Sequence, residues 1–115
     1  MTVGEMASSQ GYLVITGDAE NLNQEVKGVY ACDLLSHAMA KVEQGEVWIT
    51  VHTNLNVIAV ASLKDAACVL IPESIPVDAQ TVERAKQKGI AILSSDRSAS
   101  RLSYDILSLI HTGTK

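Results

Sequence analysis

The stretch from residue 45 to residue 72, GEVWITVHTNLNVIAVASLKDAACVLIP, constrains the fold most, because it is densely apolar and holds the only tryptophan. Residues 48–51, WITV, are aromatic or β-branched and predict a strand, which Gly45 precedes as a typical strand entry. Residues 69–71, VLI, predict a second strand. Pro72 ends it, because proline has no N–H to donate to a sheet ladder.

The segment between these two strands, residues 56–67, indicates a helix. It is too long for a turn, and its apolar side chains cover most of a helical wheel, as in a helix covered on more than one side. These apolar residues are Leu55, Val57, Ile58, Val60 and Leu63. A β-hairpin is the alternative, since residues 57–60, VIAV, could form a strand. It would require an antiparallel sheet, which the helix–strand units elsewhere in the chain disfavour.

Three segments share one pattern of helix, short break and apolar strand. They are residues 35–51 (LSHAMAKVEQGEVWITV), 61–73 (ASLKDAACVLIPE) and 83–95 (ERAKQKGIAILSS). Repeated α–β units with short connections are typical of a mostly parallel sheet covered by helices. We therefore expect residues 1–115 to form a single three-layer α/β domain, with a mostly parallel sheet of about five strands covered by helices.

The remaining elements are predicted from local patterns. Residues 1–9 are either a short helix or loose, residues 12–16 and 26–31 are strands, and residues 17–24 are a loop. Only this loop separates the two strands, so they are candidates for an appended pair. Asp33 is a good N-cap for a helix to about residue 43, and Asp78 for a polar helix over residues 79–88 that Gly89 ends. A final helix carries Leu102, Ile106, Leu107, Leu109 and Ile110.

Composition excludes several classes of protein. The 115 residues are 47% hydrophobic, which is enough for a core without disulfides or metals, and this core is aliphatic because aromatics are 3% and Phe is absent. A net charge of −4 with dispersed basic residues disfavours nucleic acid as a partner. No apolar run reaches the roughly 18 residues of a membrane span. The first five residues lack the charge and apolar run of a signal peptide, so we expect a cytoplasmic protein with reduced Cys32 and Cys68 and no metal site.

Four segments of the chain together resemble the DRTGG domain. They are residues 28–35 (GVYACDLL), 45–51 (GEVWITV), 69–72 (VLIP) and 88–95 (KGIAILSS), and the resemblance extends from about Leu13 to Leu109. The DRTGG domain is similar to the N-terminal, non-catalytic domain of HPr serine kinase/phosphorylase. The resemblance implies an α/β regulatory or accessory module, often fused to CBS domains or to a phosphotransacetylase. No reaction and no catalytic residues belong to the domain itself.

The chain departs from this family in one turn. The glycine-rich turn expected after residues 69–71 is replaced by Pro72, Glu73 and Ser74. Any ligand contact that such glycines would make by close backbone approach is therefore in doubt for this chain.

Nucleotide-hydrolysing and dinucleotide-binding signatures do not occur in the sequence. There is no G-x-x-x-x-G-K-[ST] loop to hold phosphates, and there is no G-x-G-x-x-G fingerprint. The resemblance to a kinase accessory domain therefore does not predict a kinase, and we expect no cofactor.

Two polar groups follow predicted strands and are candidate ligand-binding residues. His52, Thr53 and Asn54 follow one strand, and Ser94 and Ser95 follow another, with Asp96 and Arg97 next along the chain. Ligands bind at the carboxyl edge of α/β sheets, where helix N-termini favour anions. If the two strands are neighbours, these side chains face one crevice. The alternative is that Thr53, Asn54, Ser95 and Ser98 serve only as helix caps.

A third group, Asp33, Ser36 and His37, contains the residue types of a hydrolase triad. Ser36 and His37 are neighbours on a predicted helix and point about 100° apart, so they cannot converge on one substrate atom. A solvated helix face is the better interpretation.

Two classes of function remain. The first is a non-enzymatic regulatory or interaction module that forms a homodimer and binds a small anionic metabolite or nucleotide. A partner protein is a further candidate for interaction. The alternative is a small enzyme or phosphotransfer partner that uses His52. An ordered His52 hydrogen-bonded to a carboxylate would favour the enzyme, and a merely capped turn would favour the module.

Overall fold

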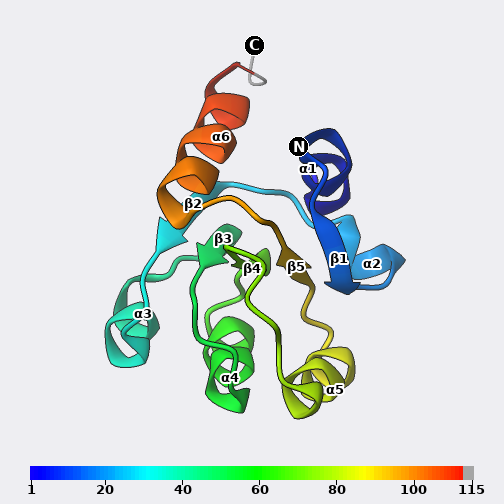
Figure 1. Ribbon diagram of the computed structural model, residues 1–115, viewed down its shortest axis with the longest axis vertical. Helices are drawn as coiled ribbons and strands as arrows, with labels where there is room; N and C mark the ends of the chain where they lie inside the picture. The colour runs from blue at the N-terminus through cyan, green and yellow to red at the C-terminus, as the bar shows by residue number, and fades with distance from the viewer. Residues whose placement is uncertain (113–115) are drawn as a thin grey trace.

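The chain folds around a five-stranded sheet with the strand order β1-β5-β4-β3-β2 (Figure 1). The computed structural model describes residues 1–112. The strands are β1 (Leu13–Thr16), β2 (Gly28–Ala31), β3 (Glu46–Ile49), β4 (Cys68–Ile71) and β5 (Ile92–Ser94). Strands β2 to β5 are parallel, and β1 runs antiparallel to β5. The predicted mostly parallel sheet of about five strands is confirmed.

Helices cover both faces of the sheet, which gives three layers (Figure 1). The helices are α1 (Val3–Gln10), α2 (Ala19–Leu22), α3 (Leu35–Lys41), α4 (Leu55–Leu63), α5 (Ala79–Lys88) and α6 (Ala99–Thr112). Helices α3, α4 and α5 connect successive parallel strands that advance in one direction across the sheet. Because such crossovers are right-handed, all three helices lie on the same face. Helices α1 and α6 lie on the other face.

The core consists of two aliphatic clusters, one on each face of the sheet. Side chains alternate along each strand, so Trp48, Val69 and Ile92, which are aligned across β3, β4 and β5, face α3, α4 and α5. Ile49, Leu70 and Leu93 face α1 and α6. All six are at most 1% exposed.

The predicted order of strand, helix and strand in the central segment is confirmed, and the hairpin alternative is excluded. Val57, Ile58 and Val60 of α4 are buried between the sheet and its neighbouring helices, as expected of a helix covered on several sides. Leu55 and Leu63, at the two ends of α4, are 36% and 70% exposed. The apolar surface of α4 is therefore incompletely covered at both ends of the helix and at the exposed Ala59 between them.

The predicted pairing of the first two strands is wrong. Strand β1 pairs with β5 at one edge of the sheet, and β2 pairs with β3 at the opposite edge. The connection between them has to cross the whole sheet, and it contains the short helix α2, where a loop was predicted. Asp18 starts α2 by accepting a hydrogen bond from the Asn21 N–H.

The ends of two helices follow the local sequence signals. Helix α1 begins with a capping box, in which Thr2 and Glu5 exchange hydrogen bonds, so the helical alternative for residues 1–9 is the correct one. Helix α5 ends at Gly89, whose φ of 69° is the left-handed conformation that glycine adopts without strain.

Candidate functional site

The loops that follow the parallel strands meet at the carboxyl edge of the sheet, where the sequence places both candidate groups. Strand β4 lies between β3 and β5, so the loop with His52, Thr53 and Asn54 and the loop with Ser94 and Ser95 do not follow neighbouring strands. The condition for one shared crevice is therefore not met.

Asp33 organises the loop after β3 and does not cap a helix. Its Oδ1 accepts hydrogen bonds from the Val51 N–H at 2.9 Å and from the Thr50 Oγ1 at 3.1 Å. The predicted N-cap role of Asp33 is wrong, because α3 begins at Leu35 after Leu34, which makes no side-chain cap. The Asp33 carboxylate is thus bonded to the loop after β3, whereas the side chains of Ser36 and His37 are exposed on α3 and share no hydrogen bond with it. The three residues therefore do not form a triad.

The rest of this loop is a hydrogen-bonded, capped turn. Asn54 is the N-cap of α4, and its Oδ1 accepts from the Asn56 N–H at 3.0 Å. The Thr53 carbonyl accepts from the Thr81 hydroxyl at 2.6 Å, which joins the loop to α5. The His52 N–H donates to Thr50 Oγ1 at 3.2 Å. Within residues 1–112, no carboxylate is hydrogen-bonded to the imidazole of His52.

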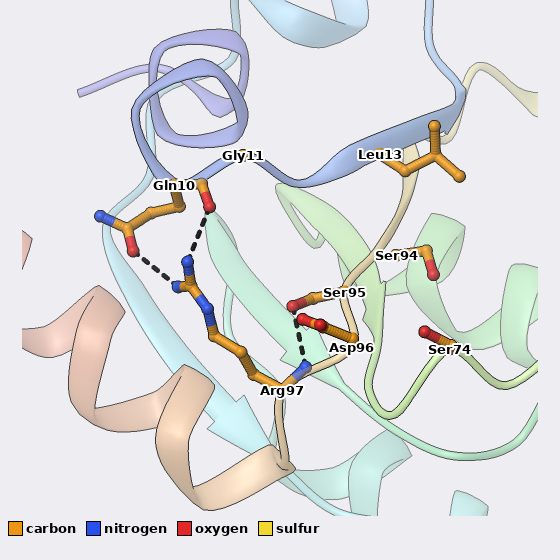
Figure 2. A pocket seen from close by; sticks show the side chains of 8 residues that line it. All are labelled: Gln10, Gly11, Leu13, Ser74, Ser94, Ser95, Asp96 and Arg97. Carbon is orange, nitrogen blue, oxygen red and sulfur yellow. Dashed lines mark hydrogen bonds between the residues drawn. The ribbon is translucent and has the colours of Figure 1, made fainter.

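A polar hollow of about 280 Å³ lies beside the other candidate group (Figure 2). It is formed by the end of α1, the start of β1, the turn after β4 and the loop after β5. Its lining residues are Gln10, Gly11, Leu13, Ser74, Ser94, Ser95, Asp96 and Arg97. The hollow includes Ser94 and Ser95 of the predicted site, and it does not include His52, Thr53 or Asn54.

The turn after β4 has a left-handed backbone without glycine. Glu73 and Ser74 have φ values of 58° and 55°. This is the conformation that the glycines expected from the family resemblance would adopt without strain, and it is costly for residues with a Cβ. The N–H groups of Glu73 and Ser74 donate to the carbonyls of Arg97 at 2.9 Å and Ser95 at 2.8 Å. The turn is therefore held against the β5–α6 loop, and Ser74 borders the hollow.

Arg97 anchors the hollow to the helices on the α1–α6 face. Its Nη1 donates to Gln10 Oε1 at 2.8 Å and to Asp105 Oδ2 at 2.9 Å, and its Nη2 donates to the Gln10 carbonyl at 2.8 Å. Its guanidinium also lies 5.6 Å from the centre of the Tyr12 ring. Asp105 pairs in addition with Arg101 at 3.3 Å. The Arg97 guanidinium is thus already hydrogen-bonded within the protein.

The serines of the β5–α6 loop have different roles. Ser95 Oγ accepts from the Arg97 N–H at 3.1 Å and closes a local turn. Ser98 Oγ accepts from the Arg101 N–H at 3.2 Å at the start of α6, so the predicted capping by Ser98 is confirmed. Ser94 ends β5 and lines the hollow.

Sequence reasoning missed Gln10, Gly11, Leu13 and Ser74 as lining residues. Gln10 and Ser74 are 64 positions apart, and only the pairing of β1 with β5 brings the end of α1 to this edge. The one local signal is the Pro72-Glu73-Ser74 turn, which stands where the family resemblance predicts glycines.

The large pKa shifts among the described residues lie in the core. Burial raises the pKa of the Cys68 thiol to about 12 and that of the Tyr12 hydroxyl to about 12. No group of three or more His, Cys, Asp or Glu residues within the described chain could hold a metal ion. No helix of that part of the chain is long and apolar enough to cross a membrane.

Comparisons with known proteins identify the fold. No family model matches the chain, and no curated protein matches it. Among solved structures, the chain is similar to the CBS and DRTGG domains of the regulatory region of a Clostridium perfringens pyrophosphatase, complexed with its activator diadenosine tetraphosphate. The TM-score is 0.72 at 10% identity, over 90% of this chain and 44% of that one. The chain thus spans less than half of that structure. The DRTGG-like α/β fold is confirmed.

Proposed function

We propose that this protein is a non-catalytic regulatory module that binds a nucleotide or a similar small anionic metabolite and acts as a homodimer in the cytoplasm. The observation that carries this proposal is that the polar side chains at the carboxyl edge of the sheet cap turns and border an open hollow. Such an arrangement suits ligand binding better than catalysis. The similar pyrophosphatase region, a regulatory region with a nucleotide activator, supports the same class of function.

The alternative of an enzyme or phosphotransfer partner depends on His52. General acid–base work by a histidine requires a partner that orients and tunes the imidazole. The nearby carboxylate, Asp33, is hydrogen-bonded to Val51 and Thr50. His52 therefore remains a candidate contact residue at the edge of the sheet, together with Thr53 and Asn54.

Ligand binding is tested by a thermal-shift screen with nucleotides, sugar phosphates and acyl phosphates. We expect nucleotides to raise the melting temperature of the wild type, because a ligand that binds only the folded state stabilises it. Ser94→Ala should reduce this shift, since Ser94 lines the hollow and its hydroxyl makes no hydrogen bond within residues 1–112. Ser36→Ala is the matched control, because Ser36 is exposed on α3 and lies outside the hollow and outside both candidate groups.

Neither of the two hydroxyls makes a hydrogen bond within residues 1–112, so each substitution should change the free energy of unfolding by less than about 0.5 kcal/mol. A wild type that responds to none of the compounds would contradict the ligand proposal. A response that His52→Gln abolishes, together with phosphate transfer to His52, would favour the alternative.

The homodimer is proposed from uncovered apolar surface. Leu102 and Ile106 of α6 are buried in the chain, whereas Tyr104 and Leu107 on the same helix are 65% and 42% exposed. A self-complementary patch with two-fold symmetry is the common way to cover such a face. We expect sedimentation equilibrium at tens of micromolar to give twice the monomer mass.

Leu107→Asp should reduce that mass to the monomer while leaving the circular dichroism spectrum unchanged. Leu63→Asp, at an exposed position on the opposite face of the sheet, is the control. A monomeric wild type would refute the dimer.

A further inference from the structure

The polar side chains that line the hollow differ in whether they already make hydrogen bonds within the protein. Arg97 donates to Gln10 and Asp105, and Ser95 accepts from the Arg97 N–H. The Asp96 carboxylate is exposed, and no described residue donates a hydrogen bond to it. Ser74 and Ser94 likewise make no side-chain hydrogen bond within residues 1–112. In Figure 2, the Asp96 carboxylate points toward Ser95 on the Gln10–Arg97 side of the hollow, and the Ser74 and Ser94 hydroxyls lie on the other side.

Asp96, the charged side chain of the hollow that has no hydrogen-bond partner within residues 1–112, is therefore an acceptor. An ionised carboxylate has no proton to donate, so it repels a phosphate and binds groups that carry O–H or N–H donors. A pair of vicinal hydroxyl groups satisfies both oxygens of a carboxylate. An acidic side chain holds the ribose hydroxyls in dinucleotide-binding folds for the same reason. Serine hydroxyls both donate and accept, so Ser74 and Ser94 complement the remaining oxygens of a sugar.

The size of the hollow agrees with a sugar-sized group. Its volume of about 280 Å³ lies just below the usual range for small-molecule sites, about 300 to 1,000 Å³. It can hold one ribose with part of its base, and it is too small for a whole dinucleotide. The phosphates of a bound nucleotide would then lie outside the hollow.

We propose that the hollow recognises the ribose of a nucleotide, with Asp96 accepting hydrogen bonds from the 2′- and 3′-hydroxyls and Ser74 and Ser94 contacting the sugar. This inference rests on the proposed function and names the part of the nucleotide that the site reads. It predicts discrimination against deoxyribose. It also predicts that removing the negative charge of Asp96 weakens nucleotide binding, whereas a phosphate site would bind more tightly after the same change.

The test measures affinities by isothermal titration calorimetry for three kinds of probe. These are the four ribonucleoside 5′-monophosphates, their 2′,3′-dideoxy counterparts, and inorganic pyrophosphate. At least one ribonucleotide should bind the wild type about 10- to 100-fold more tightly than its dideoxy counterpart, the range for hydrogen bonds to a charged group. Pyrophosphate should bind more weakly than that ribonucleotide.

Asp96→Asn should lose the same factor for the ribonucleotide and leave the dideoxy compound unaffected. Asp78→Asn is the matched control, because Asp78 is exposed at the same edge of the sheet and outside the hollow. It should change neither affinity. The comparison of the two nucleotides on the wild type needs no variant, so it stands even if Asp96→Asn fails to fold.

Two results overturn the inference and leave the proposed function in place. One is equal affinity for a ribonucleotide and its dideoxy counterpart, and the other is tighter ribonucleotide binding by Asp96→Asn. Either result would mean that the site recognises the phosphate or the base of the nucleotide and not its ribose. Absence of binding by every probe would overturn both the inference and the nucleotide proposal.

Discussion

Trp48→Ala is expected to lower the free energy of unfolding by about 3–5 kcal/mol, the range for emptying a large core site. The Trp48 side chain is fully buried beneath α3 and α4, and its Nε1 donates to the Cys32 carbonyl at 3.0 Å. Alanine would leave a cavity and an unpaired carbonyl at once. Since a domain of this size is stable by only about 5–15 kcal/mol, the variant should lose a large fraction of its stability.

Two further variants serve as comparisons, one at position 48 and one at an exposed leucine. Trp48→Phe keeps a ring and loses the hydrogen bond, so its loss should be clearly smaller than that of Trp48→Ala. Leu63→Ala, at a position 70% exposed, should change stability by less than about 0.5 kcal/mol. Urea unfolding must be followed by circular dichroism, because Trp48 is the only tryptophan. A loss below about 1 kcal/mol for Trp48→Ala would contradict the burial of the indole in β3.

The protein should lose stability steeply in alkali, because two buried acids must stay protonated in the folded state. Burial raises the pKa of Cys68 from 9.0 to about 12 and that of Tyr12 from 10.0 to about 12. Between these limits the unfolded chain has released protons that the folded chain still holds, so the free energy of unfolding falls as the pH rises. Stability is therefore complete below about pH 9 and declines up to about pH 12.

The size of this decline follows from the two shifts. It is at most about 4 kcal/mol for Cys68 and about 3 kcal/mol for Tyr12, because each tenfold change in an acid dissociation constant corresponds to about 1.4 kcal/mol. Urea unfolding between pH 8 and pH 11.5 measures it. Cys68→Ala and Tyr12→Phe should each flatten the pH dependence.

Tyr12→Phe should in addition be neutral or stabilising at pH 8. The buried Tyr12 hydroxyl makes no hydrogen bond with any described group, so removing it relieves a desolvation cost. A pH dependence that neither variant changes would show that other groups cause the alkaline loss.

The candidate site was only partly predictable from the sequence. Ser94 and Ser95 were placed correctly at the end of a strand, because a polar pair after an apolar run is a local signal. Gln10 carries no such signal, and Ser74 is marked only by the Pro72-Glu73-Ser74 turn, which stands where the family resemblance predicts glycines. Asp33 looked like an N-cap for the same local reason, and its actual role depends on Val51, 18 residues away.

The sequence alone was enough to identify every described element except the short helix α2, with α1 as one of two alternatives. Apolar periodicity, glycine and proline indicated β3, α4 and β4, the burial of Trp48 and the end of α5 at Gly89, because these depend on neighbours within a few residues. The order of the strands was decided only in the tertiary structure. Strands β3, β4 and β5 are similarly aliphatic, so their pairing is chosen by right-handed crossovers and by helix packing over the whole sheet. That order separates His52 from Ser95 and brings α1 to the hollow, and no local pattern of residues encodes it.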